Sequence, residues 1–169
     1  QAKLAELANT DPLTQLANRR TAFNSLSTQI RLAKREEYDL SIALIDLDHF
    51  KKINDSLGHP VGDQVLKCFA HMARAQFRNT DVIARIGGEE FLFIFPFTSV
   101  EQAQDLIIEF SDNLRESKEL INLIGGRLTC SVGIINAKRY DDEISAISFA
   151  DKVMYRAKYI GRDAIVIEP

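Results

Sequence analysis

Apolar residues recur along the chain with two different periods, and each period predicts one kind of element. Over residues 19–37 the apolar positions Phe23, Leu26, Ile30 and Ala33 are three or four residues apart, which is typical of one face of a helix. Elsewhere the apolar residues form short β-rich runs, which favour strands. We expect helices at 19–37, 49–56, 62–77, 100–119 and 144–160, and strands at 40–46, 81–86, 91–95, 127–135 and 164–167.

The order of these elements predicts the fold class. The segment 40–46 is apolar almost throughout, which is typical of a strand in the middle of a sheet. Gly87 and Gly88 separate two later strands and indicate a hairpin between them. The order is therefore β-α-β-β-α-β followed by a further helix and strand, which is the split βαβ layout. We predict an α/β sandwich in which helices flank a central, mainly antiparallel sheet.

The length and the start of the chain bound its domain organisation. A chain of 169 residues without an internal repeat or linker is long enough for one domain with a hydrophobic core. Residues 1–8 have a helical pattern that is expected to stop before Pro12, because proline disfavours helix in the residue before it. We expect residues 1–9 to be the end of an upstream signalling helix and residues 10–169 to be the domain. Because the chain begins with Gln1, we also expect it to be a fragment of a longer protein.

Composition and charge narrow the function classes. With 46% hydrophobic and 27% charged residues, the chain has an ordinary globular composition. Its net charge of −3 argues against a general nucleic-acid or anionic-membrane binder, since both need a basic face, but does not exclude a local basic pocket. Cys68 and Cys130 stand far apart and outside any CxxC pair, which excludes a zinc finger or a disulfide scaffold.

The sequence also bears on location. Two isolated cysteines favour a reducing compartment. No apolar run approaches the roughly 18 residues of a membrane span, and no segment has the pattern of a signal peptide. We therefore expect a soluble cytoplasmic domain, and we leave open whether an upstream region tethers the full-length protein to a membrane.

Two acidic segments are the strongest candidates for chemistry. Asp46 and Asp48 close the first strand, and Glu89 and Glu90 occupy the glycine-opened turn. In a split βαβ sheet the first strand lies beside the hairpin, so the two segments are expected to converge. Carboxylates gathered without His or Cys suit a hard cation, Mg²⁺ or Mn²⁺. Acidic residues in turns are also commonly solvated. From the residues alone, two interpretations of this segment therefore stay open: a hairpin turn without a ligand, and a metal site.

The acidic turn is part of a longer resemblance. Gly87-Gly-Glu-Glu-Phe91 resembles the signature of the GGDEF family, the bacterial diguanylate cyclases, in its Glu variant. This resemblance implies a palm-like fold of the nucleotidyl-cyclase kind and the condensation of two GTP into cyclic di-GMP with loss of two pyrophosphates. Five further blocks are similar to family motifs in the same order: DPLTQLANRR at 11–20, DLDHFKKIND at 46–55, GHPVGD at 58–63, TCSVGI at 129–134 and ADKVMYRAKYIGR at 150–162.

The resemblance implies roles for three of the four acidic residues and for one lysine. Asp46, the backbone carbonyl of Leu47 and Glu89 would hold Mg²⁺ (or Mn²⁺) at the phosphates, and Glu90 would support a second ion. Glu89 is also the candidate for accepting the proton when the 3′-hydroxyl of one GTP attacks the α-phosphate of the other. Lys51 would place a positive charge on the triphosphate and stabilise the transition state.

The substrate contacts implied by the resemblance lie in three of the blocks. Lys158 and Arg162 match contacts to the γ-phosphate, and Asn54 and Asp63 match contacts to guanine. An ionised Asp63 only accepts hydrogen bonds, which suits the N1–H and N2 donors of guanine and disfavours adenine. The full set of expected substrate-binding residues is Phe50, Lys51, Asn54, His59, Asp63, Lys158 and Arg162.

A second nucleotide site is implied by an RxxD motif. Five residues, 82–86, separate Asp81 of this motif, which begins at Arg78, from Gly87, which is the family's spacing for an inhibitory site that binds the product. Arginine can pair with a guanine edge or a phosphate, and aspartate can accept from the Watson–Crick donors. A second arginine that relatives supply from the following helix is absent, and Glu109 stands near its place.

The symmetry of the product implies a second copy of the domain. Each half of cyclic di-GMP needs one attack and one leaving group, so two domains with one GTP each would meet antiparallel across their substrates. The alternative is a non-catalytic module that binds cyclic di-GMP or GTP, and a third option is a cyclase with a monomeric product. The complete acidic set favours an enzyme, and the RxxD motif and guanine pair disfavour the third option.

Overall fold

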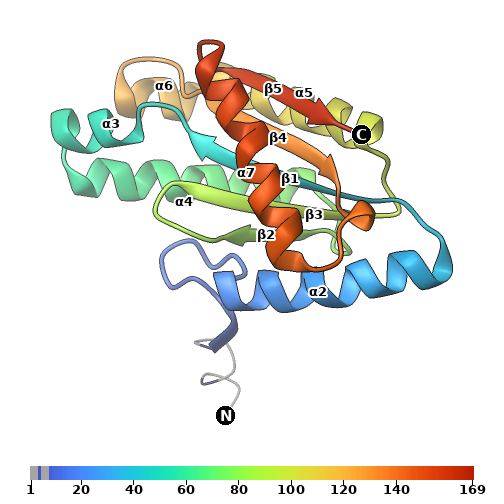
Figure 1. The fold of residues 1–169 in the computed structure, drawn as a ribbon. Coiled ribbons are helices and arrows are strands. Elements are labelled where there is room, and N and C mark those ends of the chain that lie inside the picture. The colour runs from blue at the N-terminus through green and yellow to red at the C-terminus, as the bar shows by residue number, and fades with distance from the viewer. Residues whose placement is uncertain (1–3, 5–7) are drawn as a thin grey trace.

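The computed structural model describes residues 4 and 8–169, which form a five-stranded sheet with helices on both faces (Figure 1). The strands lie in the order β2-β3-β1-β4-β5; only β4 and β5 are parallel, and the other three pairs are antiparallel. This arrangement confirms the predicted split βαβ sandwich. The strands are β1 (Leu40–Leu47), β2 (Val82–Arg85), β3 (Glu90–Pro96), β4 (Cys130–Asn136) and β5 (Ala164–Glu168).

The helices form two layers. The apolar faces of α2 and α7 pack on one side of the sheet, and those of α4 and α5 pack on the other (Figure 1). The helices are α2 (Arg19–Glu36), α3 (Phe50–Leu57), α4 (His59–Gln76), α5 (Val100–Glu116), α6 (Lys118–Ile124) and α7 (Glu143–Tyr159), with a short 3₁₀ helix at Ala137–Arg139.

The position of β1 in the middle of the sheet explains why its sequence is apolar almost throughout. Successive side chains of a strand point to opposite faces of the sheet. Ile42 and Leu44 accordingly pack with α2 and α7, whereas Ala43 and Ile45 pack with α4 and α5. Because all eight residues of β1 are buried, this strand gives a rigid support to the acidic residues at its end.

Two predicted helix boundaries were wrong, for local reasons. The helix expected at 100–119 is divided at Ser117, whose extended backbone ends α5 and whose side chain caps α6 by accepting from the Leu120 N–H. The helix expected to begin at residue 62 begins earlier, at His59. Gly58, at φ +93°, makes the turn alone, and Pro60 fits the first turn of α4, where no backbone N–H donor is needed.

The segment before α2, residues 10–18, lies along β2 at the edge of the sheet and is called the entry segment below. The predicted helix end at residues 1–9 falls mostly outside the described residues. After it, Ala17 forms a parallel bridge with Ala84 of β2, accepts from the Arg85 N–H at 2.9 Å and donates to the Ile83 carbonyl at 3.2 Å. In the part of the chain that the structure describes, no helix is long and apolar enough to cross a membrane.

Candidate functional site

The two acidic segments meet where β1 ends and β3 begins, as the sequence predicts. This end of the sheet, which carries Asp46, Glu89 and Glu90, is called the acidic edge below. β1 and β3 run antiparallel, and their register pairs Asp46, near the end of β1, with Glu90, the first residue of β3. Glu89 precedes Glu90 in the hairpin turn, and its carbonyl accepts a hydrogen bond from the Leu47 N–H at 3.2 Å. The sheet thus fixes the backbones that carry all three carboxylates.

One lysine faces this acidic edge. Lys158, from the last turn of α7, donates to Asp46 Oδ2 at 2.8 Å. Burial raises the pKa of Asp46 by more than Lys158 lowers it, and burial followed by the charge of Asp46 raises the pKa values of Glu89 and Glu90. Burial lowers the pKa of Lys158, but the hydrogen bond and charge of Asp46 raise it overall. Three carboxylates with one ammonium leave an excess of negative charge, which attracts cations.

The donor set has the chemistry of a magnesium site but is not a closed metal cage. Carboxylate and backbone carbonyl oxygens are the ligands that Mg²⁺ prefers, and Mg²⁺ commonly takes only one or two protein carboxylates. Among residues 4 and 8–169, no group of three or more His, Cys, Asp or Glu side chains is placed to hold a metal ion. Asp46, Glu89 and Glu90 would therefore supply only part of the ligand set that such an ion needs.

Asp48 has a different surrounding from Asp46, although the two are only two residues apart. Its carboxylate accepts from the hydroxyls of Thr129 and Ser131, both at 2.6 Å, and from the Asp163 N–H at 2.9 Å. The residue is buried. Asp48 therefore ties the start of β4 to the loop after α7, and it supports the neighbouring Arg162 by holding that loop.

The turn before Glu89 is held by an arginine that sequence reasoning missed. Arg85 donates through Nε and Nη2 to the Gly88 carbonyl, at 3.0 and 2.9 Å, and through Nη1 to the Asp11 carboxylate, at 3.2 and 3.3 Å. Asp11 also accepts from the backbone and hydroxyl of Thr14. Burial raises the pKa of Asp11, but the Thr14 hydrogen bonds and Arg85 lower it overall. Arg85 thus links the entry segment, through Asp11, to the turn that carries Glu89.

Replacing Arg85 by glutamine is expected to lower the free energy of unfolding by about 2 kcal/mol, because hydrogen bonds to charged groups are lost and Asp11 is left half-buried without its cation. Urea denaturation at neutral pH measures this change. Arg127→Gln is the matched control, because Arg127 has one long hydrogen bond and is exposed. A stability of Arg85→Gln equal to that of the control would contradict the assignment.

The residues expected to contact guanine come together where α3 packs on α4. Gly62 makes the approach possible, since a Cβ atom there would clash with Asn54 Oδ1 and stand 2.9 Å from Asn54 Cγ. The Asn54 amide therefore lies against α4 at Gly62, and the next residue of the chain, Asp63, is exposed. The ring of Phe50 is only 8% exposed and packs in the core, so it holds α3 in place.

Three further residues expected to contact the substrate are exposed to solvent: Lys51 and Arg162 for the phosphates and His59 for the base. Lys51 lies in the first turn of α3 and is exposed. His59, the first residue of α4, is also exposed. Arg162 is exposed in the loop after α7 with φ +66°, a conformation that the neighbouring hydrogen bond to Asp48 supports. These three side chains are free to approach a ligand from different elements.

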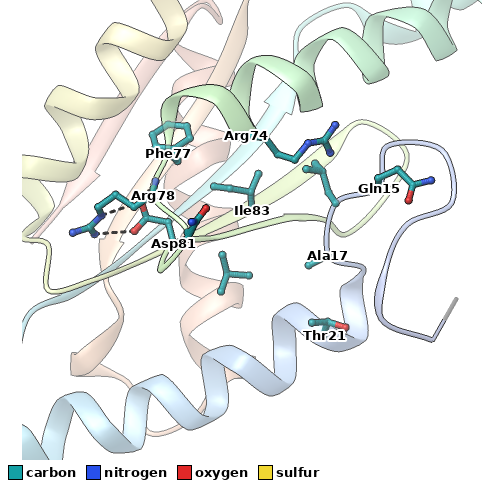
Figure 2. A pocket seen from close by; sticks show the side chains of 11 residues that line it. Gln15, Ala17, Thr21, Arg74, Phe77, Arg78, Asp81 and Ile83 are labelled. Atoms are coloured by element: carbon teal, nitrogen blue, oxygen red, sulfur yellow. Dashed lines mark hydrogen bonds and ion pairs between the residues drawn. The ribbon is translucent and has the colours of Figure 1, made fainter. Parts of the chain in front are cut away.

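The RxxD residues pair with each other. Arg78 donates through Nε and Nη2 to the two carboxylate oxygens of Asp81, at 3.2 and 2.8 Å, and through its backbone N–H at 3.0 Å. The Asp81 side chain is 1% exposed, whereas that of Arg78 is 52% exposed. Figure 2 shows this pair beside a pocket between the entry segment, the end of α4 and β2. The guanidinium of Arg78 points away from Arg74 (Figure 2).

Fold and site together define the class. A mainly antiparallel α/β sandwich with acids at the end of its central strand and in the neighbouring hairpin is a palm-like domain of the nucleotidyl-cyclase kind. The sequence profile described as "Diguanylate cyclase, GGDEF domain" matches residues 8–164. The chain belongs to the GGDEF family.

Individual relatives agree with this assignment. Diguanylate cyclase DgcP of Pseudomonas aeruginosa is 38% identical over 160 residues, with 95% of this chain and 24% of the relative covered. Response regulator PleD of Caulobacter vibrioides is 38% identical over 166 residues, with 95% and 36% covered. The chain thus spans about a quarter to a third of the length of these relatives.

Solved structures of the family share the fold over nearly the whole chain. The coiled coil and GGDEF domain of DgcB from Caulobacter crescentus, in complex with c-di-GMP, has a TM-score of 0.90 at 28% identity, with 99% of this chain and 89% of that chain covered. The diguanylate cyclase SiaD of Pseudomonas aeruginosa, in complex with its activator SiaC, has a TM-score of 0.87 at 31% identity, with 99% and 64% covered.

Proposed function

We propose that this domain is a diguanylate cyclase, which joins two GTP molecules into cyclic di-GMP and releases two pyrophosphates. The register of Asp46 with Glu90, together with the hydrogen bond from Lys158 to Asp46, is the observation that carries this proposal. The name and the 38% identity of the relative DgcP support it.

The acidic edge fits Mg²⁺ (or Mn²⁺) as cofactor. Asp46, the carbonyl of Leu47 and Glu89 would hold the ion, and Glu90 would support a second one. The negative charge left over beside Lys158 favours this. When bound, the metal stabilises charge on the transferred phosphoryl group and lowers the pKa of the attacking hydroxyl.

Each bond-forming step follows from the side chains at this edge. The 3′-oxygen of one GTP forms a bond to the α-phosphorus of the other, the bond to the bridging oxygen breaks, and pyrophosphate leaves with its electron pair. Glu89 accepts the hydroxyl proton as the general base. Lys51, Lys158 and Arg162 would hold the triphosphate from three directions and balance its charge.

Asn54 and Asp63 give the proposed site its preference for guanine, and Gly62 positions them. Gly62→Ala would force the Asn54 amide out of its place. We expect KM for GTP to rise about tenfold with little change in kcat, as for the loss of one hydrogen bond made equally in ground and transition states. Steady-state kinetics checks this, with Gly126→Ala as control, since a Cβ there meets nothing. An unchanged KM for Gly62→Ala would contradict the guanine assignment.

The proposed reaction needs a second copy of the domain, and its rate could be regulated through the pairing of the two copies and through binding of the product. Two domains would meet antiparallel across their GTP molecules, an arrangement that an upstream regulatory domain could promote. Arg78 and Asp81 form the proposed inhibitory site for cyclic di-GMP. The paired geometry of these two residues supports a preformed site in which Arg78 is the exposed member.

Product identification tests the proposed function. The chain, fused at Gln1 to a dimerising coiled coil, is incubated with GTP and Mg²⁺, and the nucleotides are identified by mass spectrometry. We expect cyclic di-GMP from the parent and none from Glu89→Ala. If the parent binds GTP or cyclic di-GMP but forms no product, the domain is a non-catalytic receptor and the proposal is overturned.

A further inference from the structure

The loop that joins α7 to β5 has an unusual backbone (Figure 1). Three consecutive residues have positive φ, at +123° for Gly161, +66° for Arg162 and +44° for Asp163. Glycine adopts such values readily, but the two residues after it do so at a cost in free energy. Residues keep an unfavourable backbone only where their surroundings hold them, and such positions gather at functional sites. Contacts around this loop must therefore fix Arg162 in its conformation.

Asp163 anchors the loop to two different elements. Its backbone N–H donates to Asp48 Oδ2, just after β1, at 2.9 Å. Its side chain accepts at Oδ1 from Arg115 Nη1, on α5, at 2.8 Å. One residue earlier, the Arg162 N–H donates to the Ala157 carbonyl at 3.0 Å. The backbone is thus held on both sides of the Arg162 side chain, which is itself exposed.

Arg115 lies in the last turn of α5, and acceptors on its own helix fix its guanidinium. Nη1 also donates to the hydroxyl of Ser111 at 2.9 Å, and Nη2 donates to the Asp112 carboxylate. Ser111 is buried, and the Arg115 side chain is only 28% exposed. A guanidinium that is already held loses little conformational freedom when it pairs with a further carboxylate. Arg115 is therefore a rigid anchor for the loop.

The charge of Arg115 bears on phosphate binding as well as on the backbone. Asp163 is adjacent in the chain to Arg162, and an unpaired carboxylate there would repel a phosphate group and compete for the Arg162 guanidinium. The ion pair with Arg115 neutralises this carboxylate. The Asp163 side chain is 44% exposed, so solvent screens the pair in part and the expected effect on binding is moderate.

We propose that Arg115 is a positioning residue for GTP: through Asp163 it holds the loop so that Arg162 meets the γ-phosphate, and it neutralises the carboxylate beside that contact. The inference rests on the proposed function, because it adds a residue to the triphosphate site assigned there. Arg115 does not itself touch the nucleotide. It comes from α5, which packs on the opposite face of the sheet from α7. Substrate binding thus depends on a helix that carries none of the proposed substrate contacts.

Calorimetric titration with two non-hydrolysable nucleotides in the presence of Mg²⁺ tests the proposal. The probes are a GTP analogue and a GDP analogue, each with a methylene group in place of the oxygen between the α- and β-phosphates. We expect the parent to bind the triphosphate more tightly than the diphosphate. Arg115→Gln is expected to reduce this preference about fivefold, the size of effect of one partly exposed ion pair, because Arg162 meets only the γ-phosphate.

Further variants tie the effect to Asp163 and Arg162. Asp163→Asn added to Arg115→Gln is expected to restore most of the preference, because the two amides can hydrogen-bond and no unpaired charge remains. In an Arg162→Ala background, Arg115→Gln is expected to have no further effect. Asp112→Asn is the matched control, because it removes the other ion pair of Arg115 and leaves Asp163 in place. Thermal unfolding of each variant verifies that it is folded.

The outcomes separate this inference from the function on which it rests. An equal loss of affinity for both analogues in Arg115→Gln would show a merely structural role and overturn the inference, as would a further loss in the Arg162→Ala background. A parent that binds both analogues equally well also overturns it, whereas formation of cyclic di-GMP is judged separately by the product assay. A parent that binds neither analogue overturns both the inference and the proposed function.

Discussion

Glu89→Gln is expected to lower the turnover of GTP by about 1000-fold, which is the size of effect that a lost general base produces. The amide keeps the shape of the side chain but neither accepts the proton nor carries the charge that holds a metal. KM for GTP is expected to rise by less than turnover falls, because the guanine contacts on α3 and α4 remain although one metal ligand is lost. Initial rates of pyrophosphate release at saturating GTP measure the loss.

The same variant separates catalysis from folding. Burial, followed by the charge of Asp46, raises the pKa of Glu89, so the folded protein disfavours the ionised form. A carboxyl group with a raised pKa opposes folding above that pKa, and the penalty disappears as the pH falls through it. Glu89→Gln is therefore expected to be at least as stable as the parent at neutral pH and to lose any advantage in acid. A variant that keeps more than a tenth of parental turnover would contradict the role of Glu89; Glu116→Gln, at an exposed position, is the control.

Gly133→Ala is expected to destabilise the fold by about 3 kcal/mol, because an added methyl group has no room. Gly133 lies in β4 where α7 crosses it, and a Cβ atom would stand 2.7 Å from the Ala150 carbonyl oxygen and 2.9 Å from the Val153 carbonyl carbon, and would also clash with the Met154 nitrogen. All of these are backbone atoms, so the whole helix must move. Urea denaturation measures the free energy of unfolding.

The position of α7 also decides where Lys158 lies, so Gly133→Ala is expected to reduce activity in the fraction that remains folded. Gly126→Ala is again the control, since its methyl group meets nothing and its backbone is not left-handed. We expect that control to change stability by less than about 1 kcal/mol. A Gly133→Ala chain as stable as the control would show that β4 and α7 are not in close contact.

The sequence predicted the features that follow from local pattern. The unbroken apolar run of β1 indicated a central strand, and Gly87-Gly88 between two such runs indicated the hairpin. Because chain order then places the hairpin beside β1, the meeting of Asp46 with Glu90 could be expected from the sequence. The family motifs added candidate roles for side chains such as Lys51, which the structure places at the exposed surface of α3.

Features that depend on packing could not be predicted in this way. Asp46 and Asp48 are the same residue type two positions apart, yet one faces Lys158 and the other is enclosed by hydroxyls of β4. Arg85 holds the acidic turn only because the entry segment passes beside β2 and brings Asp11 to it. The burial of Asp81 likewise depends on the position of Arg78 after α4. Some of these contacts join residues that are distant in the chain. Others depend on the direction in which a side chain points, which the residue type does not reveal.

The ratio of pyrophosphate released to cyclic di-GMP formed tests the central claim most directly. It is measured on the coiled-coil fusion with GTP and Mg²⁺, beside Glu89→Gln. Two attacks at the acidic edge of two facing domains predict two pyrophosphates for each cyclic di-GMP and almost none of either from the variant. One pyrophosphate for each molecule of a monomeric cyclic nucleotide, or equal turnover in Glu89→Gln, would contradict the account.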